Sequence, residues 1–256
     1  MGTRIYHVLN GDCLANEFPG KLLPGEIVVM REALIDGELG GKNLEDFWNI
    51  RAAYLDNSPD SQGKKYFSLV VPEIKKIMRA SPNAEFNLWF EYDLFCQVNL
   101  WFILSLIRRR QAYGDIFLVY PDYTKESDKW KGFGSFREDD LVRSYQKRVK
   151  LDEKDLQLGD ALWNDFKEDN LEGLKELVNV NTYSFPYLKE VIQAHIERFP
   201  QQDRKPRPES VLEEIIRNGK KDFSSAFEEF FQREGIYGFG DTQLKKIYDK
   251  VIQRMN

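Results

Sequence analysis

Four short apolar runs in the first half of the chain constrain the fold more than any other feature of the sequence. They occupy residues 5–9, 27–30, 86–90 and 116–120. Each run is rich in β-branched or aromatic residues and almost continuously apolar, which is typical of strands that are covered on both faces of a sheet. Helical patterns lie between the runs. Strands that alternate with helices predict an α/β fold with a mostly parallel open sheet and flanking helices.

Apolar residues that recur three and four positions apart predict the helices around this sheet. The patterns cover residues 44–55, 67–78 and 94–107. Asp93 directly precedes the third pattern, and its carboxylate is a suitable N-cap for a helix that starts there. Arg51 is a charged residue on the otherwise apolar face of the first helix. Because a buried charge needs a partner, Arg51 is expected to contact either a carboxylate or a ligand.

After residue 122 the pattern changes. Residues 123–137 are rich in Gly, Lys and aromatic residues and predict a loop, and from Glu138 onward only helical periodicity is found. The expected helices cover residues 139–148, 152–168, 171–178, 187–199, 208–217, 224–234 and 242–255. The charged, proline-rich residues 203–208 are the best candidate for a linker. We therefore expect an α/β domain (1–122), a loop and helical middle region (123–200) and a small helical, winged-helix-like module (201–256), so that the second half is all-helical.

The composition favours a cytoplasmic protein. The formal net charge of −5 makes the chain a poor non-specific binder of nucleic acid or of an anionic membrane. The most apolar segment, residues 94–107, is shorter than the roughly 20 apolar residues that span a bilayer, and no signal peptide precedes the first run. Two Cys and two His exclude a disulfide scaffold and a Cys-rich zinc site. His7 and His195 share no motif, and structural roles are expected for both.

Polar or turn residues follow each of the four predicted strands. Ligands bind at the carboxyl ends of the strands in an open α/β sheet, so these residues form the candidate ligand site. The candidates are Asn10, Gly11, Asp12, Arg31, Glu91 and Asp93, with Arg51 and Gln97 on neighbouring helices. The sequence identifies neither a cofactor nor a metal site nor a catalytic residue, and it does not determine the oligomeric state.

The turn after the first strand has two interpretations. Gly11 can adopt a positive φ and allow the backbone to approach a ligand, and Asp12 could then bind a ribose hydroxyl or a metal ion. Alternatively, Asp12 caps a short helix over residues 13–17, as Asx residues often do. The turn is not a phosphate loop, because neither GxxxxGK[ST] nor GxGxxG occurs in the chain.

The other strand ends also carry alternatives. Arg31 could clamp a phosphate or a carboxylate with its planar guanidinium, or it could form an ion pair with its neighbour Glu32. Glu91 and Asp93 could bind Mg²⁺ or act as an acid–base pair. If the protein is a hydrolase or transferase, Asp12 and Glu91 could be its acid–base or Mg²⁺ residues. In the simpler interpretation, Asp93 caps the following helix and Glu91 is solvated or ion-paired.

The C-terminal region supports an alternative function. Residues 201–256 carry eleven basic and ten acidic residues, and the last helix bears Lys245, Lys246, Lys250 and Arg254. A regulatory protein could use this module to bind DNA or a partner protein, although its near-neutral charge makes DNA the weaker expectation. A third alternative is a non-catalytic interaction protein that uses the aromatic residues of 123–137 as its contact surface.

Several segments resemble a bacterial family that is known as domain of unknown function eighteen thirty-five. Residues 7–12, His-Val-Leu-Asn-Gly-Asp, resemble its opening H-I-V-x-G-D, and residues 31–37 resemble its D/E-x-L-x-x-G-P segment, although Glu38 stands where Pro is common. Residues 88–100 resemble W-x-x-x-x-x-E-Q-x-x-L with the acids placed differently. Leu212-Glu213, Ile215-Ile216, Gly219 and Gly240-Asp241 resemble the helical domain that often follows. The family implies no activity that could be transferred to this chain.

Together these features predict a cytoplasmic protein with a site for a small anionic or nucleotide-like ligand at the strand ends. The strand-end residues of the predicted site coincide with the segments that carry the resemblance. The sequence leaves open whether the protein is an enzyme or a binding protein.

Overall fold

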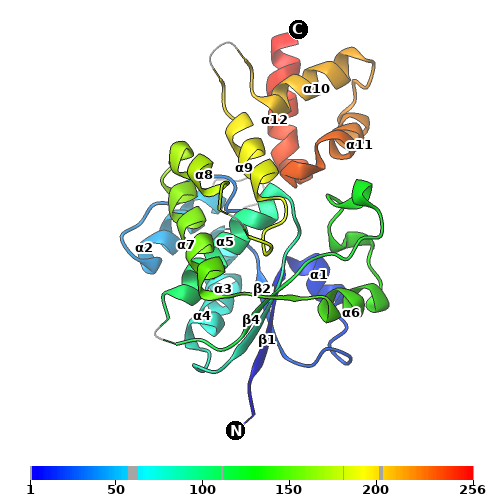
Figure 1. Ribbon diagram of the computed structural model, residues 1–256. Helices are drawn as coiled ribbons and strands as arrows, with labels where there is room; N and C mark the ends of the chain where they lie inside the picture. Colours follow the sequence, from blue (N-terminus) through cyan, green and yellow to red (C-terminus); the bar gives the residue numbers. More distant parts are fainter. Residues whose placement is uncertain (1, 57–62, 111, 181, 202–203, 256) are drawn as a thin grey trace.

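A computed structural model describes residues 2–56, 63–110, 112–180, 182–201 and 204–255 (Figure 1). Within them the sheet has the order β2-β1-β3-β4-β5, and all pairs are parallel except β4 with β5. The strands are β1 (Ile5–Asn10), β2 (Glu26–Met30), β3 (Glu85–Trp89), β4 (Ile116–Val119) and β5 (Val149–Lys150). The predicted α/β class and the four predicted strands are confirmed. The sequence pattern missed β5, because this edge strand has only two residues and both are exposed.

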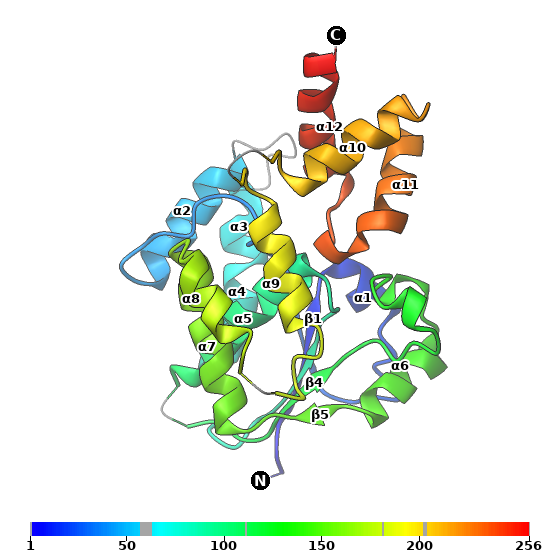
Figure 2. The same cartoon turned by 45° about the horizontal axis from the view of Figure 1, so that its top comes forward.

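Side chains alternate between the two faces of the sheet, and each face has its own core. Val8 and Leu88 belong to the larger core, whereas Leu9 and Trp89 belong to the smaller one. The helices α1 (Asp12–Glu17) and α6 (Glu138–Gln146) cover the smaller core. The opposite face is covered by α4 (Val71–Arg79) and α5 (Leu94–Arg108), and Figure 2 shows the two layers on either side of the strands.

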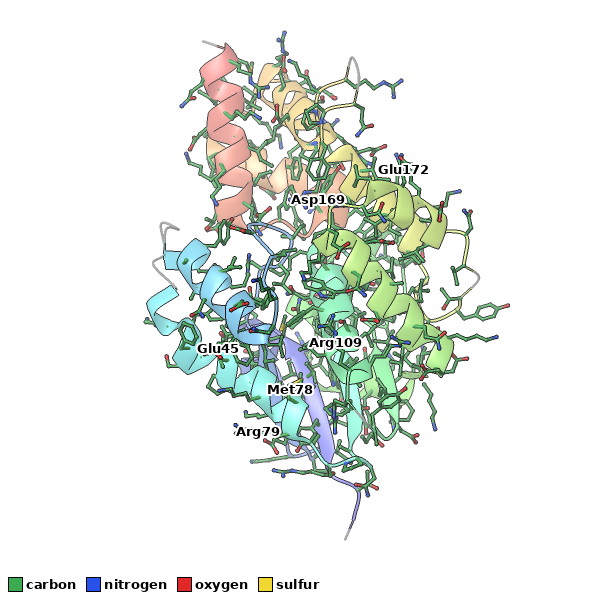
Figure 3. The ribbon with its side chains drawn as sticks, turned by 90° about the vertical axis from the view of Figure 1, so that its left-hand side faces the viewer. Glu45, Met78, Arg79, Arg109, Asp169 and Glu172 are labelled. Carbon is green, nitrogen blue, oxygen red and sulfur yellow. The ribbon has the colours of Figure 1, made fainter. Side chains whose placement is uncertain are left out.

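The helices that precede β3 differ from the prediction at one point. They are α2 (Leu44–Asp56), α3 (Gly63–Leu69) and α4, so the helix expected over residues 67–78 is in fact two helices. Pro72 lies in the first turn of α4. Proline has no amide hydrogen to continue the hydrogen bonding of α3, and its ring is tolerated only near a helix start. Figure 3 views the molecule from the side of α2 and α4, on which Glu45 and Met78 are labelled.

The second half of the chain is helical, as predicted. After α6 its helices are α7 (Glu153–Lys167), α8 (Leu171–Leu177), α9 (Leu188–Glu197), α10 (Arg207–Arg217), α11 (Phe223–Glu234) and α12 (Asp241–Met255). The loop over residues 123–137 contains two short 3₁₀ turns, Glu126–Asp128 and Phe133–Ser135, and Phe133 packs into the smaller core. Of the predicted linker 203–208, Asp203 lies outside the described residues, and α10 begins within it at Arg207.

The C-terminal helices lie beyond the carboxyl ends of the parallel strands (Figure 1). A 3₁₀ turn, η3 (Gly235–Tyr237), contacts both α5 and α9. Arg198, just after α9, forms an ion pair of 2.8 Å with Asp36. The helical region therefore closes over the edge of the sheet at which the candidate residues lie. Among the described helices, none combines the length and the apolar character needed to cross a bilayer.

Candidate functional site

A pocket of about 470 Å³ opens at the carboxyl ends of β1 and β2. Its walls come from the segments after these strands, from α2, α3 and α5, and from the C-terminal α12. It is lined by Asn10, Gly11, Asp12, Met30, Arg31, Glu32, Ala33, Asp36, Tyr54, Leu55, Lys65, Tyr66, Leu69, Val70, Phe95, Thr242, Gln243 and Lys246. This volume lies within the range of about 300–1,000 Å³ that is usual for small-molecule sites.

Four of the eight predicted site residues line this pocket: Asn10, Gly11, Asp12 and Arg31. The other four do not. Arg51 lies buried behind the pocket wall, and Glu91, Asp93 and Gln97 lie on the far side of Asn10, toward β3. The strand order reverses between β1 and β3, where ligands of open α/β sheets usually bind. Here that crevice holds the side chains around Glu91, and the pocket lies on the other side of β1.

Asp12 and Arg31 form the polar rim of the pocket. The Arg31 Nε lies 2.9 Å from each carboxylate oxygen of Asp12, and a second guanidinium nitrogen lies 2.8 Å from Oδ1. This contact raises the pKa of Arg31 above its ordinary value. Asp12 is the first residue of α1 and makes no capping hydrogen bond, while Gly11 precedes it with φ at 97°. Asp12 is therefore an ion-pair partner rather than a helix cap, and Arg31 does not pair with Glu32.

Arg51 and Glu32 form a buried ion pair behind the pocket. Both side chains are 0% exposed, and Arg51 Nη2 lies 2.9 Å from Glu32 Oε2. Arg51 also donates to the carbonyl oxygen of Asp36 at 2.8 Å, and the Tyr66 hydroxyl donates to Glu32. Burial and this carboxylate raise the pKa of Tyr66. The expected contact of Arg51 with a carboxylate is confirmed, and the pair fixes the segment after β2 against α2 and α3.

Asn99 of α5 ties the ends of β1 and β2 together. Its Nδ2 donates to the Glu32 carbonyl oxygen at 2.7 Å and to Asn10 Oδ1 at 3.0 Å. Asn10 in turn donates from Nδ2 to Cys96 Sγ at 2.9 Å. Both polar atoms of the Asn10 side chain are therefore engaged within the protein. Asn10 shapes the pocket wall, and the sequence analysis did not identify the Asn99 side chain that fixes it.

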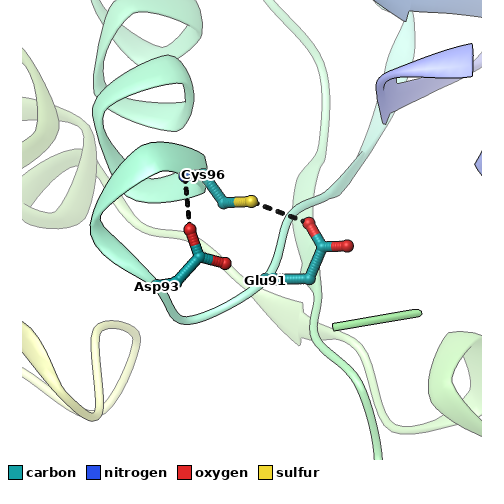
Figure 4. A group of neighbouring side chains, drawn as sticks. All are labelled: Glu91, Asp93 and Cys96. Carbon is teal, nitrogen blue, oxygen red and sulfur yellow. Dashed lines mark hydrogen bonds between the residues drawn. The ribbon is translucent and has the colours of Figure 1, made fainter. Parts of the chain in front are cut away.

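Glu91, Asp93 and Cys96 form an acid–thiol cluster next to the pocket (Figure 4). Cys96 Sγ donates to Glu91 Oε2 at 2.9 Å, and the Cys96 amide donates to Asp93 Oδ1 at 3.0 Å. The second contact is the predicted N-cap of α5. The Phe133 amide donates to Glu91 Oε1 at 3.2 Å, and Gln97 Nε2 donates to the Glu91 carbonyl oxygen at 2.7 Å.

Burial controls the protonation of the acid–thiol cluster. Burial raises the pKa of the Cys96 thiol well above its ordinary value. The thiol therefore stays protonated and is the donor in its hydrogen bond to Glu91. Burial and the neighbouring Glu91 carboxylate raise the pKa of Asp93 to about 7. One donor atom from each residue lies within 4.8 Å of the others, and carboxylates with a thiolate are ligands for Zn²⁺. A metal ion would have to displace the thiol proton, and the hydrogen bonds account for the arrangement without one.

The C-terminal region closes directly over this cluster. A Cβ atom placed on Gly238 would lie 1.9 Å from Asp93 Oδ1, and Gly238 has φ at 62°. Only glycine fits this approach without a shift of Asp93, because other residues carry a Cβ and rarely adopt this φ. Gly238 therefore allows the turn before α12 to pack against the start of α5.

The two histidines are buried away from the pocket. His7 Nδ1 accepts a hydrogen bond of 3.1 Å from Trp89, and burial lowers the pKa of His7 to about 4. His195 packs against Phe166 and Phe199, and burial lowers its pKa to about 3. Both are neutral members of the core at physiological pH.

The structure adds two basic residues that the sequence analysis did not assign to the site. Lys65 of α3 lay in no predicted motif. Lys246 belongs to the basic last helix that the sequence predicts, and the structure places it in the pocket wall. No spacing rule connects them, because they are about 180 positions apart and line the same pocket only through the docking of α12. No protein-family model matches this sequence, and no curated protein matches it either.

Proposed function

We propose that this protein binds a small anionic ligand in the pocket at the ends of β1 and β2. One observation carries the proposal. Each acidic residue of the pocket wall is paired with an arginine, whereas the ammonium groups of Lys65 and Lys246 have no ion-pair or hydrogen-bond partner among the described residues. An anion that enters the pocket would supply the missing counter-charge.

The ion pairs of the wall leave an excess of positive charge. Asp12 is paired with Arg31, Glu32 with the buried Arg51, and Asp36 with Arg198. Three arginines therefore compensate three carboxylates, and the two lysines remain. Positive charge inside a concave site concentrates the field and attracts anions.

The pocket also combines polar and apolar walls. Met30, Leu55 and Phe95 contribute apolar surface, and Tyr54 contributes an aromatic ring. Such a mixture is typical of sites that hold organic ligands by contact and orient them by a few polar groups. It favours the nucleotide-like ligand expected from the sequence. Because both cysteines are free, we also propose a cytoplasmic location.

The alternative of DNA binding through the last helix has less support. Lys245 pairs with Asp249, and both Lys250 and Arg254 pair with Glu209. Lys246 lines the pocket instead. Three of the four basic residues therefore have acidic partners within the protein. The resemblance to domain of unknown function eighteen thirty-five stays a prediction and adds no activity.

The test is a ligand screen by thermal shift, followed by calorimetric titration of each hit. The panel contains nucleotides, sugar phosphates and dicarboxylates. A ligand at 100 times its Kd should stabilise the wild type by about 2.7 kcal/mol. The Lys65→Met/Lys246→Met variant should lose binding, because it removes both uncompensated charges. Lys154→Met, an exposed lysine on α7 outside the pocket, is the matched control. Unchanged affinity in the double variant, or no anionic ligand at all, would overturn the proposal.

A further inference from the structure

We infer that the anion is the dianionic phosphate of a monoester that carries a flat apolar group and free hydroxyls, that is, a nucleoside monophosphate. This inference rests on the proposed function and specifies the ligand class of the same pocket. Three features of the pocket carry it: the size of the charge excess, the position of the apolar wall, and the exposure of one carboxylate.

The charge excess matches a dianion. After the three arginine–carboxylate pairs are formed, two ammonium groups remain, those of Lys65 and Lys246. A phosphate monoester carries a charge of about −1.5 to −2 at pH 7. A carboxylate or a phosphodiester supplies only one negative charge, and a nucleoside triphosphate carries more than the two lysines can neutralise. The balance therefore favours the monoester.

The apolar wall suits a heterocyclic base. Tyr54 is partly exposed in the pocket, whereas Tyr66 is 1% exposed and supports the wall from behind through its hydrogen bond to Glu32. The Arg51 guanidinium lies 5.0 Å from the centre of the Tyr54 ring and helps to fix it. Phe95 adds a further ring to the same pocket. Aromatic faces bind nucleic-acid bases by stacking, with little dependence on which base is present.

Asp12 is placed to bind sugar hydroxyls. Its side chain is 58% exposed, whereas that of Asp36 is 27% exposed and that of Glu32 is 0% exposed. Both Asp12 oxygens accept from Arg31, which orients the carboxylate. An ionised carboxylate is an acceptor with lone pairs for about four hydrogen bonds, so it can also accept from a pair of hydroxyls.

The inference is tested by calorimetric titration of the full chain with matched ligands. These are the four common nucleoside monophosphates, their nucleosides, the monoanionic methyl esters of the monophosphates, inorganic phosphate, ribose 5-phosphate and succinate. We expect at least one monophosphate to bind. Its nucleoside and its methyl ester should each bind at least about tenfold more weakly, the effect of losing one charge-assisted hydrogen bond. Inorganic phosphate and ribose 5-phosphate should also be weaker, because they lack the base.

Variants assign each part of the ligand to its residue. Lys65→Met and Lys246→Met should each weaken monophosphate binding at least about tenfold, and Lys154→Met should leave it unchanged. Asp12→Asn should reduce the preference for a ribonucleotide over its 2′,3′-dideoxy analogue. Equal binding of the methyl ester, or tighter binding of succinate or ribose 5-phosphate, would overturn the inference while the proposed anion site stands. Failure of every anion in the panel would overturn the proposed function itself.

Discussion

Two groups of carboxylates lie at the ends of β2 and β3, the strands on either side of β1, and the protein stabilises them in opposite ways. Glu32, after β2, is paired with Arg51 and accepts from Tyr66. Glu91 and Asp93, after β3, have no basic partner among the described residues and contact a thiol and backbone amides instead. A cation beside a buried carboxylate compensates its charge, whereas burial without one favours the protonated form. The first group is an ion pair, and in the second group burial raises the pKa of Asp93.

The largest effect is expected where the ion pair is broken. Arg51→Met would leave Glu32 buried without its cation, and we expect a loss of about 3–5 kcal/mol in the free energy of unfolding. Urea denaturation measures this loss. The Glu32→Gln/Arg51→Met double variant is the control, because it removes both charges and should recover most of the stability. If the double variant is as unstable as Arg51→Met, the uncompensated charge of Glu32 is not the cause.

A smaller effect should follow from the proton on Asp93. Its pKa is raised from 3.8 to about 7 in the folded protein. Between these values the folded state holds a proton that the unfolded state has lost. The stabilisation from this group is thus complete below pH 4 and is lost as pH rises toward 7. In Asp93→Asn the side chain cannot titrate, and its amide oxygen can still accept the capping hydrogen bond from the Cys96 amide. Relative to the variant, the wild type should lose on the order of 2 kcal/mol from pH 5 to pH 7.

This prediction must be measured as the difference between variant and wild type at each pH. The lowered pKa values of His7 and His195 make the folded state more stable as the pH rises, which is the opposite direction. The reason is that the unfolded state binds protons at pH values where these buried rings stay neutral. Both proteins contain the histidines, so their contribution cancels in the difference. Asp93→Ala also removes the charge but loses the cap, and it should be less stable than Asp93→Asn at every pH. A difference that does not change with pH would contradict the assignment.

The smallest effect concerns the turn that covers the acid–thiol cluster. Gly238→Ala would place a methyl group against Asp93 and force alanine to a φ of 62°. We expect a loss of about 1–2 kcal/mol in the free energy of unfolding, partly from the backbone and partly from the collision. Gly219→Ala is the matched control, because Gly219 has φ at 104° and nothing within 4 Å of an added Cβ. If both variants lose the same stability, the contact with Asp93 contributes nothing.

The sequence predicted local structure well where the pattern is strong. The four parallel strands followed from continuous apolar runs, and most helix bounds followed from apolar residues three and four positions apart. The break between α3 and α4 was missed although Pro72 could have marked it, since apolar periodicity continued across the proline. Strand β5 was missed because its two exposed residues are too few to form a sequence pattern.

The candidate site was only partly predictable. Residues directly after β1 and β2 reached the pocket because chain connectivity alone places them at the edge of the sheet. Glu91, Asp93 and Gln97 follow β3 by the same logic, yet their side chains turn toward Cys96 and one another. Which way a side chain turns depends on the partners that neighbouring elements present, and no local pattern records those partners.

The sequence by itself determined the α/β class, the helical second half and the edge of the sheet at which polar residues gather. These features depend on periodicity and on chain direction, which are local properties. The tertiary structure alone decided that Arg51 compensates Glu32, that Lys246 of α12 and Lys65 of α3 line one pocket, and that Gly238 closes over Asp93. Each of these arrangements brings together residues from separate parts of the chain and depends on burial and charge, which exist only after the elements have packed.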